Sequence, residues 1–214
     1  MKSRDEVPLS WRELLKSPSS RGALTFCFLA LLIIIFYLPV FYRDVLGPKP
    51  GILIHDVVLN TFVPVNWSLP TFAIIYLSII QTFFSNLRNP GVLLIGLTCY
   101  LAISLLRMAA MYMITFEPPS DMILLVDPVT SRFYPDAGFA KDLFFSGHVS
   151  TMTLMVLLEK NRLARMIKIA GTMIVALFLL WQHVHYFLDI LVAPFIASAV
   201  YYTVRWWLSP LPKG

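Results

Sequence analysis

Charged side chains are scarce in this sequence. Lysine, arginine, aspartate and glutamate together make up 14% of the 214 residues, whereas a soluble domain usually carries about 25%. Hydrophobic residues make up 58%, and they are gathered in long blocks. This distribution argues against a large water-soluble core and indicates a chain embedded in a lipid bilayer.

Cysteine is also scarce, and the first apolar block differs from the pattern of a secretory signal. Cys27 and Cys99 both lie within apolar blocks, which argues against a structural disulfide and against a thiolate metal site. A charged leader of 21 residues precedes the first apolar block, and no small-residue cleavage site follows that block. We therefore expect a retained first membrane span rather than a removed signal peptide.

The apolar blocks predict an all-α integral membrane protein with six transmembrane helices. A spanning helix needs about 20 mostly apolar residues. Segments of this kind, of which the fourth is the shortest, lie at 24–42, 67–85, 92–115, 143–159, 167–183 and 186–207. We thus expect a six-span catalytic domain over 24–207, between an N-terminal segment of residues 1–23 and a tail of residues 208–214.

The N-terminal segment contains a helix-start signal. Ser10 and Glu13 have the spacing of a capping box, which predicts a short helix. Leucine and tryptophan side chains next to basic residues suit a helix at the membrane surface. A disordered basic leader is the alternative interpretation.

Basic residues lie mostly on one side of the predicted spans. Twelve of the 17 lysines and arginines fall in the N-terminal segment, in the loops after the second and fourth spans, and near the C-terminus. Four lie on the opposite side, and Arg107 lies within the third span. Because cytoplasmic loops carry the excess of basic residues, both termini are expected in the cytoplasm. The net charge of +5 therefore reflects topology and not a nucleic-acid partner.

Polar residues that can carry chemistry gather on the external side of this topology. Segment 146–148, Ser-Gly-His, lies near the outer start of the fourth span, and His185 and Asp189 open the sixth. Arg107 lies about two turns below the outer end of the third span. The second long external loop, 116–142, adds acidic residues, which are Glu117, Asp121, Asp127, Asp136 and Asp142.

The spacing of these residues suits phosphoryl chemistry. His185 and Asp189 are four residues apart, so on a helix they share a face and the carboxylate can orient one imidazole nitrogen. Two helix N-termini at the same place, with free N–H groups, favour an anion. Arg107 can add a bidentate contact to phosphate oxygens. Ionisable residues within spans are usually functional, and a charge-stabilising site of this kind is what phosphoryl transfer requires.

Each residue also has a structural interpretation. A histidine at an interface is often only an interfacial polar group, Asp189 can stabilise a helix start, and Arg107 can pair with a loop acid. A zinc site of two histidines and an aspartate is an alternative, although the Ser-Gly-His element and Arg107 fit an anion better. His183 lies two residues from His185, so it faces elsewhere and is not assigned to the site.

Segments 142–148 (Asp-Leu-Phe-Phe-Ser-Gly-His) and 185–190 (His-Tyr-Phe-Leu-Asp-Ile) resemble the two signature motifs of the sphingomyelin synthase family. That family belongs to the type 2 phosphatidic acid phosphatase superfamily. Segment 106–115, followed by two prolines, is similar to the signature of the third span. Segment 48–56 is a weaker match to the proline-rich first motif, with Gly51 where an aspartate is expected. The resemblance covers roughly residues 45–207.

The chain departs from both branches of that superfamily. Phosphatases have a basic tripod that includes an arginine six residues before the second histidine, where this chain has Leu179. A matching Lys-to-Arg-Pro motif is also missing, which favours the synthase-like branch. Eukaryotic synthases have external cysteines near the Ser-Gly-His motif, where this chain has Ala140 and Lys141. These departures imply a compact bacterial member in the inner membrane, with its active site on the periplasmic side.

The resemblance implies a role for each site residue. His185 would attack phosphorus with Asp189 orienting it, and His148 would protonate the departing diacylglycerol and later deprotonate a ceramide-like acceptor. The implied phosphate- and substrate-binding residues are Arg107, Asp142, Ser146 and Gly147. No metal or other cofactor is implied.

The resulting hypothesis is a transferase that moves a phospho-headgroup from phosphatidylcholine or phosphatidylethanolamine to a ceramide-like or diacylglycerol-like lipid. A hydrolase of phospholipase C or phosphatase type is the second hypothesis, because water can replace the acceptor at the same residues. A non-catalytic lipid-binding or transport protein is the third.

Overall fold

The structure is a computed structural model that describes residues 10–132 and 140–208. Those residues form helices joined by loops, and they contain no β-strand beyond one isolated bridge between Ile52 and Phe116. The helices are α1 (Trp11–Lys16), α2 (Pro18–Val40), α3 (Ser68–Ser85), α4 (Pro90–Met113), α5 (Gly147–Leu158), α6 (Arg162–Trp181) and α7 (Phe187–Leu208). Short helical turns are η1 (Phe41–Leu46), which continues α2, η2 (Leu59–Thr61) and η3 (Thr130–Arg132).

Five of the described helices are long and apolar enough to cross a membrane, namely α2 with η1, α3, α4, α6 and α7. The prediction of an all-α integral membrane protein is therefore confirmed. The remaining predicted span is a shorter apolar helix, because α5 has only 12 residues. At 1.5 Å per residue it is about 18 Å long, against about 30 Å for the hydrocarbon core.

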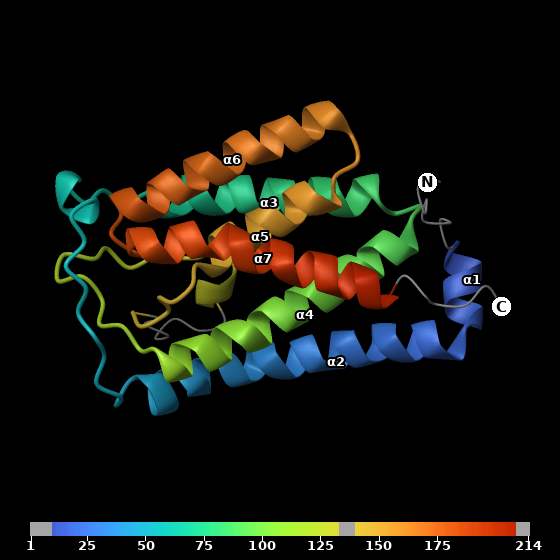
Figure 1. Cartoon of the computed structure of the whole chain (residues 1–214), viewed down its shortest axis with the longest axis horizontal. Helices are drawn as coiled ribbons and strands as arrows, with labels where there is room; N and C mark the ends of the chain where they lie inside the picture. Colours follow the sequence, from blue (N-terminus) through green and yellow to red (C-terminus); the bar gives the residue numbers. More distant parts are fainter. Residues whose placement is uncertain (1–9, 133–139, 209–214) are drawn as a thin grey trace.

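The fourth predicted span is short because residues 143–146 are not helical. Leu143, Phe145 and Ser146 are nevertheless buried. Non-helical backbone at membrane depth is tolerated where protein surrounds it. Residues 143–146 meet this condition because they lead into α5, which lies at the centre of the bundle and packs against α3, α4, α6 and α7 (Figure 1).

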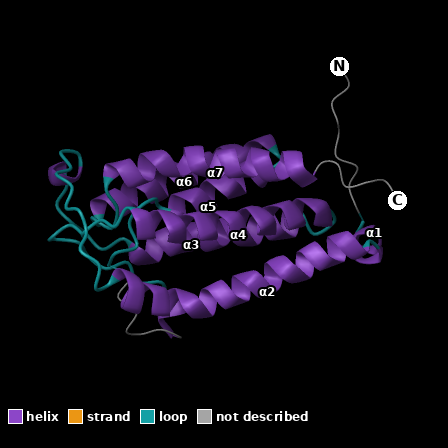
Figure 2. Cartoon of the chain, turned by 60° about the horizontal axis from the view of Figure 1, so that its bottom comes forward, coloured by secondary structure: helices purple, strands orange, loops and turns teal. Residues whose placement is uncertain are grey.

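The α2 helix lies at the edge of the bundle, where it packs along α4 (Figure 2). Its outer face exposes large apolar side chains such as Phe26, Ile33 and Phe36. The outer face of α6 does the same with Leu163 and Met173. Exposed apolar surface of this kind is expected on helices that face lipid.

The bundle has two distinct ends. The α1 helix and the last turn of α7 lie at one end, and the loops that follow η1 and α4 gather at the other (Figure 1).

The expected capping box is formed at α1, where Ser10 N donates to Glu13 Oε2 over 2.7 Å. Leu14 is fully buried and the Trp11 indole donates to Leu87 O, so α1 is docked on the protein. Residues 1–9 and the tail beyond Leu208 lie outside the described residues.

The α6 helix begins five residues before the predicted boundary. Asn161 caps it by accepting a hydrogen bond from Ala164 N at 3.0 Å. Lys168, which the count of basic residues placed in the cytoplasmic loop and the predicted span 167–183 placed at a helix start, lies well inside α6. It is buried and pairs with Glu159 at 2.8 Å, so its charge is compensated inside the bundle.

The two long loops are joined to each other and to the helices below them. Ile52 N donates to Thr115 O, and Glu117 N donates to Ile52 O. The buried Gln182 side chain, after α6, accepts from Trp67 N and donates to Ser68 Oγ at 3.0 Å. This network fixes the segment between α6 and α7 that carries His183 and His185.

Candidate active site

Two histidines meet inside the loop end of the bundle. His148 lies in the first turn of α5, and His185 lies in the turn just before α7. Their ring centroids are 6.2 Å apart with an interplanar angle of 61°. Phe72 of α3 packs edge-on against the His148 ring at 5.5 Å. The two imidazoles thus lie close to each other, among α3, α5 and α7.

Asp189 stands behind His185. The Nδ1 atom of His185 is 3.6 Å from Oδ2 of Asp189, and both side chains are fully buried. The sequence placed both residues on one helix, which is wrong for His185 because α7 begins at Phe187. The turn bends the ring toward the carboxylate instead, since the same Oδ2 accepts a hydrogen bond from Tyr186 N at 3.1 Å.

Several polar atoms of this cluster have no hydrogen-bond partner. Within the described residues, these are both ring nitrogens of His185, Nδ1 of His148 and Oδ1 of Asp189. Buried polar groups are nearly always paired in folded proteins, so four unpaired atoms on three neighbouring side chains make this cluster a candidate site. Because Nδ1 of His185 faces Asp189, the Nε2 atom is the one available to a reacting group.

Arg107 reaches the same region from α4, and it is already paired. Its guanidinium contacts Asp142 in an ion pair, and Nε donates to Phe145 O at 2.9 Å. Tyr42, buried at the end of the first span, donates to the same Asp142 oxygen. The side chains of Arg107 and Asp142 are 15% and 20% exposed, so this ion pair is not completely buried.

Gly147 permits this approach of Arg107. A Cβ atom at position 147 would collide with the Arg107 guanidinium. Ser146 beside it is fully buried and caps α5, with its Oγ accepting from Val149 N. The Ser-Gly-His segment therefore brings a cation against the start of α5, next to His148.

The α7 N-terminus differs from the expected anion site. Phe187 N donates to Asp56 Oδ2 at 2.6 Å, and Tyr186 N donates to Asp189. Carboxylates therefore accept the hydrogen bonds of main-chain N–H groups that we expected, from the sequence, to bind phosphate. The favourable end for an anion is that of α5, where the Arg107 cation lies.

Other acidic residues of the second loop have structural partners. His183 Nδ1 is 2.9 Å from Asp121 Oδ1, and this hydrogen bond lowers the pKa of Asp121. Lys141 pairs with Glu117 at 2.9 Å, and that hydrogen bond with the one from Gly51 N lowers the pKa of Glu117. Asp127 accepts from Tyr76 OH at 2.6 Å. Asp136 lies outside the described residues.

Gly51 packs directly on the main chain of Phe116 and Glu117, so a Cβ there would come within 2.7 Å of both. A side chain larger than glycine at position 51 would therefore clash with that main chain. Cys27 and Cys99 are both free and buried. Among residues 10–132 and 140–208, no group of three histidine, cysteine or acidic side chains is placed to hold a metal ion.

Sequence reasoning missed Tyr42 and Phe72, because neither stands out in its apolar, aromatic-rich span. Asp56 lay within the weakly matching first motif, but its role as a cap of α7 depends on a fold contact. The motif residues His148, His185 and Asp189 do come together, and Arg107, Asp142, Ser146 and Gly147 lie beside them.

Residues 141–206 match the protein-family model described as PAP2 superfamily C-terminal. The match covers less than a third of the chain and includes α5, α6 and nearly all of α7. It contains both histidines and Asp189 but not Arg107. It supports the type 2 phosphatidic acid phosphatase superfamily, and with it an enzyme that acts on phosphate esters. No curated protein matches the chain.

Proposed function

We propose that this protein is a membrane phospholipid headgroup transferase, similar to sphingomyelin or ceramide phosphoethanolamine synthases. It moves a phospho-headgroup from phosphatidylcholine or phosphatidylethanolamine to a ceramide-like alcohol. The observation that carries the proposal is the pair of imidazoles 6.2 Å apart, with a buried carboxylate 3.6 Å from one of them.

In the first half-reaction, Nε2 of His185 attacks the phosphorus of the donor lipid. A P–N bond forms, and the bond between phosphorus and the diacylglycerol oxygen breaks. His148, in its protonated form, gives its proton to that oxygen, and diacylglycerol leaves. Asp189 stabilises the positive charge that develops on the His185 ring.

In the second half-reaction, neutral His148 takes the proton from the acceptor hydroxyl. The acceptor oxygen attacks phosphorus, the P–N bond breaks and His185 is released. His148 ends protonated, ready for the next donor. Two easier displacements thus replace one difficult displacement, and the chain's own residues supply every proton.

Arg107 is the proposed phosphate-binding cation. Its guanidinium lies against Gly147 at the start of α5 and contacts Asp142. A donor phosphate at this place would gain the guanidinium and the positive end of α5 together. Asp142 then acts as the group that holds Arg107 in position before substrate arrives.

A hydrolase is the second candidate, because the matched superfamily includes phosphatases and water can replace the acceptor alcohol. One observation argues against a phosphatase, although it does not separate a transferase from a phospholipase C. The position where phosphatases have their third basic residue holds Leu179, which is fully buried in the apolar core. The cations that a phosphate monoester requires are thus fewer here, as expected for a phosphodiester lipid.

We place the active site outside the cytoplasm, on the periplasmic side of a bacterial inner membrane. The excess of basic residues in the segments predicted to be cytoplasmic, twelve against four on the other side, supports this orientation. A reporter that works only outside the cytoplasm should be active when fused after Val129 and inactive when fused after Arg162.

Product analysis separates the candidate reactions. Purified protein is incubated with labelled ceramide and one defined phospholipid at a time, and the lipids are resolved. Transfer gives a labelled phospho-headgroup ceramide and diacylglycerol. Release of diacylglycerol with free phosphocholine or phosphoethanolamine identifies the hydrolase, and absence of both products rejects the two proposals.

A further inference from the structure

Part of the second long loop returns along α3 instead of staying above it. Val126 N donates to Ser68 Oγ, at the first residue of α3, over 3.1 Å. The next residue, Asp127, accepts a hydrogen bond of 2.6 Å from the hydroxyl of Tyr76. Tyr76 lies eight residues after Ser68, which is about 12 Å along the helix. The loop therefore carries a carboxylate below the start of α3, toward the depth of the membrane.

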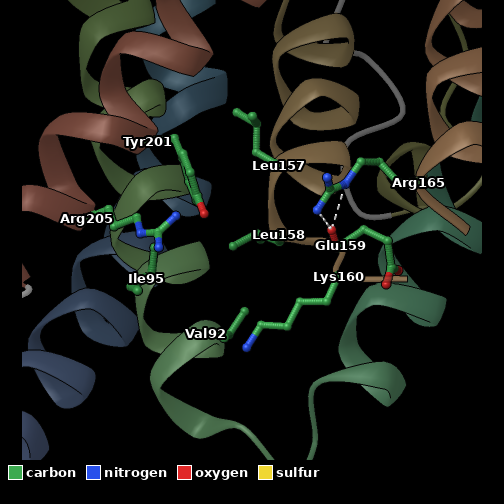
Figure 3. A pocket seen from close by; sticks show the side chains of 9 residues that line it. All are labelled: Val92, Ile95, Leu157, Leu158, Glu159, Lys160, Arg165, Tyr201 and Arg205. Carbon is green, nitrogen blue, oxygen red and sulfur yellow. Dashed lines mark hydrogen bonds between the residues drawn. The ribbon is translucent and has the colours of Figure 1, made fainter. Parts of the chain in front are cut away.

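Asp127 differs from other acids of the bundle in its lack of a cationic partner. Glu159, at the opposite end of the bundle (Figure 3), pairs with Lys168 at 2.8 Å. Asp142 pairs with Arg107. Within the part of the chain that the structure describes, Asp127 has no ion pair of this kind. Because a charge at membrane depth is costly, an uncompensated one is a candidate for contact with a charged substrate.

Only one oxygen of the Asp127 carboxylate is used by the fold. Oδ1 accepts from Tyr76 OH at 2.6 Å and from Val129 N at 2.8 Å. Among the described residues, no group donates a hydrogen bond to Oδ2. The carboxylate is thus held in place through Oδ1, and Oδ2 remains as an acceptor for a cation.

Two aromatic rings connect Asp127 to the histidine site. The Tyr76 and Phe72 rings stack with centroids 5.9 Å apart, and Phe72 packs edge-on against the His148 ring at 5.5 Å. Asp127 is also close enough to His148 to interact with it electrostatically. A carboxylate beside an aromatic ring is a favourable environment for an organic ammonium group, because both attract the positive charge.

Charges of opposite sign approach His148 from two helices. Arg107 of α4 lies against Gly147, the residue before His148. Asp127 lies on the α3 side, where it is held by Tyr76. A zwitterionic headgroup carries a phosphate and an ammonium separated by a short linker, so it matches this pair of charges. A headgroup without a cation would leave Asp127 uncompensated, which selects against it.

We propose that Asp127 and the Tyr76 ring bind the positively charged amine of the donor headgroup. This proposal rests on the proposed function, and it narrows the donor to a phosphodiester lipid that carries an ammonium group. Oδ2 of Asp127 contacts the ammonium, and the Tyr76 ring lies beside it. Asp127 takes no part in bond making, so its effect is on the choice of donor.

The test measures binding in a His185→Ala background, in which the donor is not consumed by the proposed nucleophile. Short-chain phosphatidylcholine and phosphatidylglycerol with the same chains are compared by native mass spectrometry of the full-length protein in a neutral detergent. We expect phosphatidylcholine to bind more tightly. Adding Asp127→Asn should weaken phosphatidylcholine binding about tenfold, the effect of losing a contact to a charged group, and leave phosphatidylglycerol binding unchanged. Asparagine keeps the size of the side chain and an acceptor for Tyr76.

Asp121→Asn in the same background is the matched control, because Asp121 belongs to the same loop but pairs with His183. It should leave the preference for phosphatidylcholine unchanged. Tyr76→Phe keeps the ring and removes the hydrogen bond that holds Asp127, so it should weaken phosphatidylcholine binding about threefold. Equal weakening of both lipids by Asp127→Asn, or no weakening of either, would overturn the proposal. A selective loss as large in Asp121→Asn would mean diffuse charge and would also overturn it.

Turnover by the wild-type protein separates this proposal from the proposed function. A preference in binding that depends on Asp127, without consumption of any donor, would reject the transferase and keep the amine site. Consumption of phosphatidylcholine with an unchanged donor preference in Asp127→Asn would keep the transferase and reject the amine site.

Discussion

Ser146 N donates a hydrogen bond of 3.2 Å to the main-chain oxygen of Asp189. This bond joins the first turn of α5 to the first turn of α7, and each turn carries one part of the candidate site. His148 follows Ser146 by two residues, and Asp189 lies beside His185. The two imidazoles, far apart in sequence, are therefore held together by main-chain contacts as well as by side-chain packing.

His148→Ala and His185→Ala should each lower turnover by about two to four orders of magnitude, because each removes a reacting group. Both proteins should still fold, since the ring nitrogens of His185 have no structural partner. Turnover of the best lipid donor and the melting temperature are measured together.

His183→Ala is the control for these variants, since His183 is equally buried but pairs with Asp121. It should lower the melting temperature while most of the turnover remains. A loss of turnover as large as that of His185→Ala would refute the assignment of roles.

Arg107→Lys should lower kcat/KM by about ten- to a hundredfold, the effect of losing a hydrogen bond to a charged group. Lysine keeps the charge beside Asp142 but lacks the fork that also reaches Phe145 O. The melting temperature should change by only a few degrees. Arg43→Lys is the control, because Arg43 is exposed and pairs only locally with Asp44. A large loss of stability with preserved turnover would make Arg107 a structural residue.

Gly147→Ala should lower kcat/KM by about tenfold or more, because the new methyl group displaces the Arg107 guanidinium. The comparison is Gly22→Ala, a helical position with nothing within 4 Å of the new Cβ. That substitution should add about 0.5–1 kcal/mol of stability and leave turnover unchanged. Equal activities of the two variants would remove the steric argument for Gly147.

Glu117 should make the loop contacts sensitive to acid. Its pKa lies below the ordinary value of 4.5, so its stabilising effect is present above that pH and is lost as pH falls further. At pH 6 the wild type should have a higher melting temperature than Glu117→Gln. The corresponding difference in the free energy of unfolding should be at most about 1 kcal/mol, because the pair with Lys141 is partly exposed. The difference between the two proteins should close toward pH 3. A constant difference would show that the Glu117 charge contributes nothing.

Hydropathy predicted the spans well, because a bilayer imposes length and apolarity on each helix. Hydropathy failed at the fourth span. There, neighbouring helices rather than lipid surround residues 143–146 and α5, so this span does not need the full length and continuous helix that lipid requires. The meeting of His148 with His185 followed from their motifs and from alternating span direction. A loop acid as the partner of Arg107 was one sequence interpretation, but the sequence did not identify Asp142 as that acid or Tyr42 beside it, since these contacts depend on the packing of α2 against α4. The burial of Lys168 was likewise not predicted, because its partner Glu159 follows a different helix, α5.

The covalent intermediate gives the most direct test of the central claim, that His185 is the nucleophile. His148→Ala is mixed with a donor whose leaving group needs no acid, so the first step proceeds while the second lacks its base. The sample is quenched rapidly, kept alkaline because phosphohistidine is acid-labile, and analysed by mass spectrometry. We predict the added mass of the phospho-headgroup on His185 and none in His148→Ala/His185→Ala. Release of the leaving group in a normal single turnover without any adduct would contradict the mechanism and make His185 a general base.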